Sequence, residues 1–360
     1  MLSSSPFYYL NYLLFQKMKI RILFFFFCVI SLGLISFSLQ TNTQLIEFVV
    51  PKKWPKPVYN FAKNPMIEEG FELGRKLFYD PILSRDKTIS CASCHLQYTG
   101  FTHVDHAVSH GIEGRKGTRN SPVLINLAWN KFFHWDGGVN NLEVQGINPI
   151  EHPAEMDNSL EEVIRRLSKS EAYPSLFKKA FGTSEINTTT IMKALTQFTV
   201  SLVSSNSKYD QVMRKEKGVF FTAQEKNGLT LFRSDCNSCH TEPLFTNTFF
   251  ASNGLPIDTL LKDIGRFGIT HLPKDSMQFK IPTLRNIEFT FPYMHDGRYK
   301  KLKEVLNYYS EGINVKSVYL HGNLKKPLRY TETQKKDLLA FLFTLTDKTF
   351  LYDNRFSFPK

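Results

Sequence analysis

Two stretches of the chain, Cys91-Ala92-Ser93-Cys94-His95 and Cys236-Asn237-Ser238-Cys239-His240, carry the same pattern of two cysteines followed by a histidine. This Cys-x-x-Cys-His pattern is typical of c-type haem attachment. Two thiols one helical turn apart can add to the vinyl groups of a haem, and the adjoining imidazole can then bind the iron. The alternatives are one zinc site built from all four thiolates, or two disulfides, with the histidines incidental. The two histidines favour two covalently bound c-type haems, one on Cys91, Cys94 and His95 and the other on Cys236, Cys239 and His240.

The composition is that of an ordinary globular protein that is rich in aromatic residues. The 360 residues include 32 Phe and 15 Tyr, which suits packing around porphyrins but equally a generous core. The formal charge is +12, and removing the first 40 residues leaves 42 basic and 33 acidic residues, or +9. A basic surface can steer an acidic redox partner, although a dispersed, solvated surface explains the charge as well. No run of Lys and Arg with interleaved aromatics indicates nucleic acid, so none is expected as a partner.

The N-terminus has the pattern of an export signal. Met18-Lys19-Ile20-Arg21 precedes an apolar run from 22 to 37, and a polar stretch follows it. We expect residues 1–40 to be a signal peptide or an N-terminal anchor, with Met18 as a candidate start. The run is short for a membrane span of about 20 residues, which favours cleavage over anchoring. Membrane contact is expected only if the segment is not cleaved. Because c-type haem is attached outside the bacterial cytoplasm, a periplasmic location follows.

The chain repeats itself around the two cysteine pairs. From the first matched proline onward, the landmarks recur at a constant offset of 160 residues. They are Pro122, Leu124, Asn126 and Asp136-Gly137, matched by Pro282, Leu284, Asn286 and Asp296-Gly297. Earlier landmarks also match: Leu77-Phe78 with Leu231-Phe232, and Phe101-Thr102 with Phe245-Thr246. Similar loops at one offset predict two homologous haem domains.

The segments between these landmarks have helical patterns. Apolar spacing predicts helices over 68–79, 158–168 and 189–203. Thr222 and Thr331 open capping boxes that predict two more helices. The stretches with Pro122, Pro149, Pro153, Pro282 and Pro292 are expected to be ordered loops, and few strand patterns occur.

The fold class is therefore expected to be mainly α, with two tandem cytochrome-c-like haem domains related by internal duplication. We expect a linker over 41–60, an N-terminal haem domain over 61–215 and a C-terminal haem domain over 216–346. Residues 347–360 are expected to be a tail.

With these motifs in place, the chain resembles the bacterial di-haem cytochrome c peroxidases and their MauG-type relatives. The resemblance covers about residues 65–346. It rests on several motifs in the correct order: Arg119-Asn120-Ser121-Pro122, Trp135-Asp136-Gly137, Glu155-Met156, Pro282-Thr283-Leu284-Arg285-Asn286 and Pro292-Tyr293-Met294-His295-Asp296-Gly297. It implies unequal haems, of which the N-terminal one reacts with peroxide and the C-terminal one handles electrons.

The resemblance also implies roles for three side chains in catalysis. Cleavage of a peroxide O–O bond needs an acid/base group that moves a proton from the inner oxygen to the leaving one. Glu155 matches the family's acid/base glutamate, and Gln145 matches a distal amide that can hydrogen-bond peroxide. Trp135 matches a tryptophan between the haems, a candidate electron relay, and packing alone is its other interpretation.

A calcium ion between the domains is implied at Asn120 and the backbone carbonyls of Thr290 and Pro292. Amide and carbonyl oxygens are suitable ligands for Ca²⁺. The site is known here only through the resemblance.

The family divides at the sixth ligand of the C-terminal haem. Fourteen residues beyond His295, the peroxidases have Met and the MauG-type enzymes have Tyr, and this chain has Tyr309. A phenolate is a harder ligand than a thioether and should stabilise higher oxidation states of iron. The alternative is that Tyr309 is a core aromatic and that Met294 is the ligand.

The distal position of the N-terminal haem differs from that of many peroxidases, in which a histidine blocks the iron until the enzyme is half reduced. Alignment from Arg119-Asn120 puts Ile112 there, with His110 two residues earlier. We favour an open pocket, while a loop shift could bring His110, His106 or His103 to the iron.

The function expected from these features is that of a periplasmic peroxidase reducing hydrogen peroxide to water. Electrons would come from a small cytochrome c or a cupredoxin. One alternative is a MauG-like oxidase of a protein or organic substrate, and another is a non-enzymatic di-haem electron carrier. The resemblance also implies that the protein can form a homodimer, although the sequence itself contains no interface signature.

Overall fold

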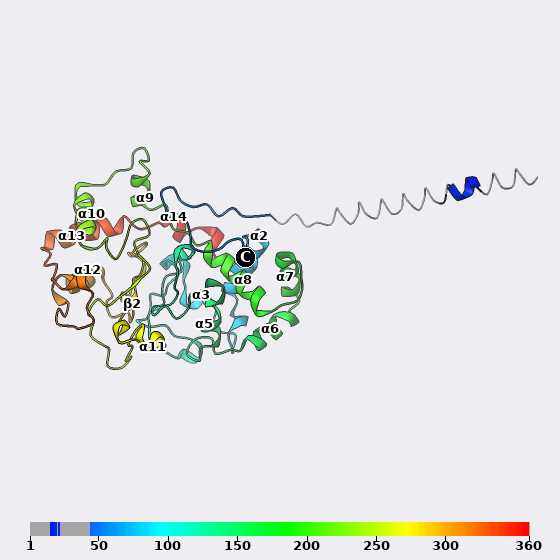
Figure 1. Ribbon diagram of the computed structural model, residues 1–360, viewed down its shortest axis with the longest axis horizontal. Helices are drawn as coiled ribbons and strands as arrows, with labels where there is room; N and C mark the ends of the chain where they lie inside the picture. Colours follow the sequence, from blue (N-terminus) through cyan, green and yellow to red (C-terminus); the bar gives the residue numbers. More distant parts are fainter. Residues whose placement is uncertain (1–14, 20, 22–43, 360) are drawn as a thin grey trace, which may run out of the picture. The chain divides into compact units, whose positions relative to one another are not determined.

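The computed structural model describes residues 15–19, 21 and 44–359 (Figure 1). Residues 45–360 form one compact unit. Most of the predicted signal peptide or anchor, with Cys28, lies outside the described residues. Among the described residues, no helix is long and apolar enough to cross a membrane.

The described fold is mainly α, as predicted. Its one sheet is a short antiparallel pair, in which Phe250 lies opposite Lys280. The helices and strands are, in chain order, α2 (Glu68–Tyr79), α3 (Cys91–Cys94), α4 (Leu142–Gln145), α5 (Ile147–Glu151), α6 (Leu160–Lys169), α7 (Tyr173–Phe181), α8 (Thr188–Val200), α9 (Lys208–Met213), α10 (Ala223–Asp235), β1 (Phe250–Ala251), α11 (Phe267–Thr270), β2 (Phe279–Lys280), α12 (Leu302–Asn307), α13 (Glu332–Phe343) and α14 (Lys348–Leu351).

The predicted helices are confirmed as α2, α6, α8, α10 and α13, and α2 has the predicted bounds. Helix α8 ends three residues before the predicted limit, at Val200. Both capping boxes form: Thr222 and Glu225 cap α10, and Thr331 and Gln334 cap α13. In each box the side chains satisfy backbone N–H groups that have no partner within the helix.

One loop prediction is wrong, because Pro149 lies inside α5. It is the third residue of that helix. The first N–H groups of a helix have no intrahelical acceptor, so a proline there costs no hydrogen bond.

Two pairs of long helices pack closely, α2 on α8 and α10 on α13 (Figure 1). Each crossing depends on a glycine. A Cβ atom on Gly74 would lie 2.0 Å from the carbonyl oxygen of Ala194, and one on Gly228 would lie 1.9 Å from that of Asp337. The absence of a side chain therefore sets both helix separations.

The buried apolar side chains form two large clusters, one around each helix pair. The first contains Phe71, Phe78 and Phe198, and the second contains Phe232 and Phe341. The expected tail contributes to the first cluster, since Phe350, Leu351 and Phe356 are buried in it. The expected linker also contacts this cluster, through Trp54 and Tyr59. The two haem-domain boundaries stay a prediction.

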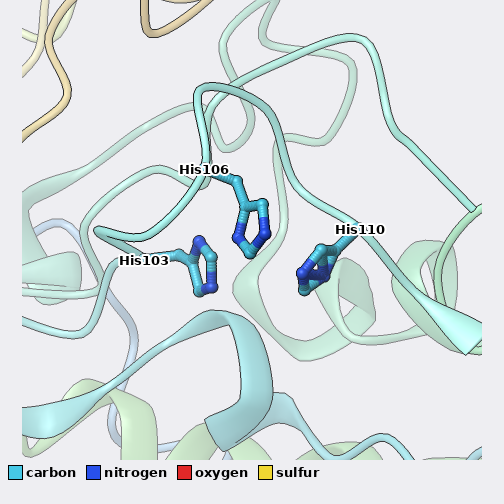
Figure 2. Close-up of side chains that lie close together, drawn as sticks. All are labelled: His103, His106 and His110. Atoms are coloured by element: carbon cyan, nitrogen blue, oxygen red, sulfur yellow. The ribbon is translucent and has the colours of Figure 1, made fainter. Parts of the chain in front are cut away.

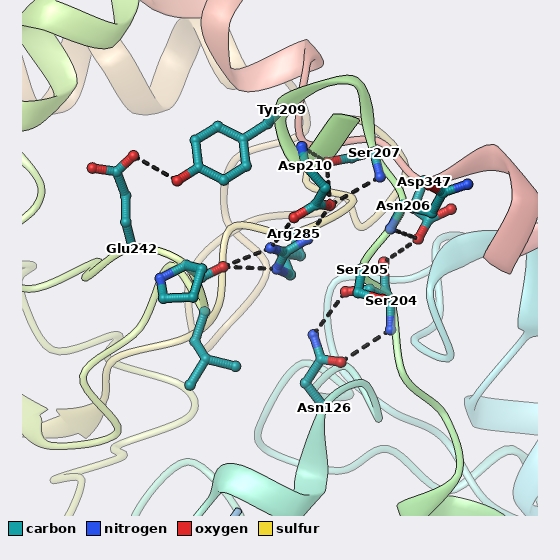
Figure 3. A network of polar contacts seen from close by, with 12 residues as sticks. Asn126, Ser204, Ser205, Asn206, Ser207, Tyr209, Asp210, Glu242, Arg285 and Asp347 are labelled. Carbon is teal, nitrogen blue, oxygen red and sulfur yellow. Dashed lines mark hydrogen bonds and ion pairs between the residues drawn. The ribbon is translucent and has the colours of Figure 1, made fainter. Parts of the chain in front are cut away.

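The matched asparagines make the same hydrogen bonds in the two halves. Asn126 and Asn286 both adopt left-handed backbone conformations, with φ of 57° and 58°. The backbone N–H of Asn126 donates to Leu202 (2.8 Å), and its side-chain oxygen accepts from the N–H of Ser204 (3.0 Å; Figure 3). Asn286 does the same with Leu345 (3.1 Å) and Asp347 (2.8 Å).

Candidate functional site

The first cysteine pair lies on α3, one short helical turn. The Ser90 and Ser93 side chains form a capping box at its start, and His95 ends it. The His95 Nδ1 atom lies 2.8 Å from the backbone oxygen of Phe101. An imidazole whose Nδ1 donates to a carbonyl presents Nε2 as a metal ligand. Burial lowers the pKa of His95 to about 4, which keeps the ring neutral.

The second motif repeats this arrangement at the end of α10. The Nδ1 atom of His240 lies 3.1 Å from the oxygen of Pro282 and 3.3 Å from that of Phe245. Burial lowers the pKa of this ring as well. The two acceptor residues, Phe101 and Phe245, both have positive φ, 59° and 55°. The same backbone conformation therefore presents the acceptor oxygen to the histidine in each motif.

All four motif cysteines are free thiols, which is at odds with the disulfide alternative. Cys91 and Cys236 pack against the edges of the two apolar clusters. Burial raises the pKa of each of these two thiols to about 12. The thiols are therefore protonated and apolar in character.

The second motif faces a large cavity. Cys236, Cys239 and His240 line it together with side chains from the first half of the chain, including Trp135. The indole Nε1 of Trp135 donates to the backbone oxygen of Asn120 (2.8 Å). Two thiols, a neutral imidazole with a fixed ring and an adjoining cavity are the donor set that a c-type haem requires.

Tyr309 and Met294, the two candidate axial ligands, line this same cavity. The amide Nδ2 of Asn253 donates to the Tyr309 hydroxyl (3.4 Å) and lies 3.5 Å from the Met294 sulfur. Tyr309 belongs to a π-helical turn, Tyr308–Gly312, that continues α12. Such turns are frequent at functional sites. Burial raises the pKa of Tyr309 to about 12.

Glu155 lies in the turn after α5, on the side of the first cysteine motif. Burial, and after it the charge of Glu155, raises the pKa of Cys94 to about 11. The backbone oxygen of Glu155 accepts from the N–H of Ile112 (2.9 Å). A Cβ on Gly111 would lie 2.1 Å from that oxygen, so only glycine allows this approach. Burial raises the pKa of the Glu155 carboxyl.

Gln145 and the distal loop lie on the same half of the chain as Glu155. Gln145 is the half-buried last residue of α4, and no hydrogen bond joins it to Glu155 among the described residues. Ile112 is fully buried. The backbone oxygen of His110 lies 3.5 Å from the Cys94 sulfur, which places the histidine loop beside the first motif.

The three residues of the predicted calcium site all line the cavity: Asn120, Thr290 and Pro292. Asn120 is buried, and its amide donates to the backbone oxygen of Ala107 (3.1 Å). Its backbone N–H donates to the oxygen of His295 (2.7 Å), which links the two matched loops.

Asn253 and Lys280 are among the cavity residues that were not anticipated from the sequence. Burial lowers the pKa of Lys280 to about 8, and its backbone N–H donates to the oxygen of Trp135 (2.6 Å). Neither residue belongs to a repeated motif. Only the folded chain brings them to the site.

Known proteins that are similar to this chain indicate its family. Residues 68–218 match the family model described as di-haem cytochrome c peroxidase. The methylamine utilization protein MauG of Methylorubrum extorquens is 35% identical over 297 residues, which cover 81% of this chain and 82% of that protein. The chain belongs to the di-haem cytochrome c peroxidase family. Haem is therefore its cofactor, and it is an oxidoreductase.

Other members of the family are similar over most of their length. The cytochrome c551 peroxidase of Nitrosomonas europaea is 33% identical over 79% of this chain and 82% of its own. The crystal structure of a MauG-like protein associated with microbial copper homeostasis has a TM-score of 0.81 and 35% identity. That match covers 87% of this chain and 99% of the other. The shared fold therefore spans most of this chain.

Proposed function

We propose that this chain is a di-haem peroxidase that reduces hydrogen peroxide to water. The reaction consumes two electrons and two protons for each peroxide and releases two waters. The observation that carries the proposal is the paired arrangement of His95 and His240, each fixed through Nδ1 by a backbone oxygen. This arrangement suits a proximal ligand in each of two haems.

Two haems would be held covalently, one by Cys91 and Cys94 and the other by Cys236 and Cys239. Protonated thiols packed at the edge of an apolar cluster suit addition to vinyl groups. When bound, the haem irons supply a coordination site for peroxide and the one-electron chemistry. The matched loops and hydrogen bonds support an origin by duplication and the two domains 61–215 and 216–346.

Glu155 is proposed as the group that takes the proton from the inner oxygen of peroxide and gives it to the leaving one. Its backbone contact with the loop that lies beside Cys94 and its raised pKa support this role, because a carboxyl with a pKa nearer neutrality exchanges protons more readily at neutral pH. Gln145 would position peroxide by donating a hydrogen bond. Ile112 is compatible with a distal side that has no blocking ligand.

Electron entry is proposed through the C-terminal half. Trp135 lines the cavity of the second motif and belongs to the first half, so it suits a relay between the haems. A small cytochrome c or a cupredoxin would donate the electrons one at a time. We place the protein in the periplasm. A calcium ion is proposed at Asn120 and the backbone carbonyls of Thr290 and Pro292. A homodimer is the assembly to test.

A second function, MauG-like oxidation of a protein or organic substrate, is favoured by one observation. Tyr309 lines the cavity of the second motif, at the position that distinguishes the MauG-type relatives. If the Tyr309 oxygen binds the C-terminal iron, the two haems can store oxidising equivalents without a prior reduction.

The test is addition of one equivalent of hydrogen peroxide to the diferric protein without a reductant, followed by stopped-flow Soret spectroscopy. A fast spectral change supports an open N-terminal site and the chemistry favoured by Tyr309. A change only after one haem is reduced would assign the chain to the reductively activated peroxidases. No turnover with any reduced donor would contradict peroxidase function.

A further inference from the structure

Three histidines of one loop lie close together (Figure 2), and the backbone oxygen of one of them, His110, lies 3.5 Å from the Cys94 sulfur of the first motif. His103, His106 and His110 each offer a ring nitrogen, and these atoms all lie within 4.8 Å of one another. The ring centroids of His106 and His110 are 4.1 Å apart, and those of His103 and His106 are 5.1 Å apart. The proposed peroxidase chemistry uses none of these side chains.

The innermost ring has an unsatisfied nitrogen. His103 is only 5% exposed, and its Nδ1 atom is buried without a hydrogen-bond partner. A buried polar atom without a partner costs free energy, so such atoms are rare in folded proteins unless an ion or a water satisfies them. The His103 ring is nearly parallel to that of His106, and a ring nitrogen of each histidine lies within 4.8 Å of one from each of the other two. Neutral imidazole nitrogens gathered in this way have a metal ion as a natural partner.

We propose that His103, His106 and His110 bind one divalent transition-metal ion, Cu²⁺ or Zn²⁺. Imidazole suits both metals, and Cu²⁺ generally binds a given nitrogen site more tightly. Three nitrogens at about 2.0–2.1 Å from a tetrahedral metal lie about 3.4 Å apart, so the loop closes by about 1 Å or a little more on binding. The fourth position stays open for water or a small ligand.

The burial of the three residues gives the ion a route to the site. His106 is exposed, His110 is half-buried and His103 is buried. An ion can therefore bind first at His106 and then move inward. The site lies on the surface side of the loop whose His110 oxygen lies beside Cys94.

The experiment uses the haem-loaded protein after treatment with EDTA, with the haem content measured separately. Equilibrium dialysis against Zn²⁺ or Cu²⁺, followed by elemental analysis, gives the metal stoichiometry beyond haem iron. We expect one ion per chain, with Cu²⁺ displacing Zn²⁺, and a Cu²⁺ EPR signal split by nitrogen ligands. His106→Ala should weaken binding by at least about 100-fold, since loss of even an outer-shell partner costs about 10- to 100-fold.

His110→Ala provides a second variant, and His271→Asn is the matched control. His271 is an exposed histidine outside the cluster, in a left-handed conformation that asparagine accepts. It should leave the stoichiometry at one. Wild-type protein that binds no additional ion, or variants at 106 and 110 that bind as well as wild type, would overturn the proposal. Because haem is counted independently, failure of haem loading cannot be mistaken for either result.

Discussion

The side-chain amide of Asn253 donates a hydrogen bond to the hydroxyl oxygen of Tyr309 across 3.4 Å. The same amide nitrogen lies 3.5 Å from the sulfur of Met294, so one side chain contacts both candidate ligands in the cavity of the second motif. The Tyr309 oxygen, which is the harder ligand, and the Met294 sulfur, which is the softer one, are thus held side by side. Substitution at each position can decide which of them serves the C-terminal haem.

Tyr309→Phe removes the oxygen and keeps the ring, so it should change the visible and EPR spectra of the ferric C-terminal haem while the fold is retained. Met294→Leu should leave those spectra unchanged. Tyr308→Phe is the matched control, because the Tyr308 hydroxyl donates to the backbone oxygen of Asn253 instead (2.9 Å). A spectral change in the Met294 variant alone would assign the sulfur as the ligand.

Asp210→Asn should destabilise the protein by about 3–5 kcal/mol, since it leaves the buried Arg285 guanidinium without its counter-charge. The two terminal nitrogens of the Arg285 guanidinium each lie 2.8 Å from an oxygen of the Asp210 carboxylate (Figure 3). The Arg285 side chain is 0% exposed and that of Asp210 is 4% exposed. Urea unfolding measures the free energy. Glu162→Gln on the surface of α6, where Glu162 pairs with Arg165 and Arg166, is the control and should change it little.

The same pair predicts a dependence on pH. Burial alone would raise the pKa of Asp210, but the hydrogen bonds and charge of Arg285 outweigh it and lower the pKa. A lowered carboxyl pKa contributes stability that is present above the unfolded-state value of about 3.9 and is lost as the pH falls through the folded-state value. The stability difference between wild type and Asp210→Asn should therefore shrink below about pH 4. A constant difference down to pH 2 would contradict it.

Gly228→Ala should destabilise the fold, although alanine is normally the better helix former by about 0.5–1 kcal/mol. The new Cβ would lie 1.9 Å from the backbone oxygen of Asp337, so α10 and α13 must separate. Overpacking of this kind costs about 1–3 kcal/mol. Gly268→Ala in α11 is the control, because nothing lies within 4 Å of its Cβ. Thermal unfolding should show opposite shifts in Tm, and equal shifts would refute the steric argument.

The parts of the fold that could be predicted from sequence are those with local causes. Helix α2 follows from apolar spacing, and α10 and α13 follow from the capping side chains at Thr222 and Thr331, so their positions needed no knowledge of the rest of the chain. The roles of Phe350 and Phe356 could not be predicted, because an apolar residue does not say which cluster it joins. Both are buried against the first core, far away in sequence.

The candidate site divides in the same way. The haem-attachment residues are contiguous, and their chemistry is carried by spacing alone. Asn253 contacts Tyr309, and Gly111 contacts Glu155, and both of these partners are distant in sequence. Single asparagines and glycines are common, so no pattern could mark these two before the chain was folded.

Glu155→Gln should lower peroxide turnover by about 10²- to 10⁴-fold, the usual contribution of a positioned acid/base group, while the haem content stays at two. Glu151→Gln, at the exposed last residue of α5 four residues earlier, is the matched control and should keep wild-type turnover. The carboxylate form accepts the peroxide proton, so the rate should rise as the pH rises through the pKa of Glu155. Burial raises that pKa, which moves this rise above the usual range of a glutamate. The rise should disappear in Glu155→Gln. A variant that keeps both the rate and the pH profile would remove Glu155 from the mechanism.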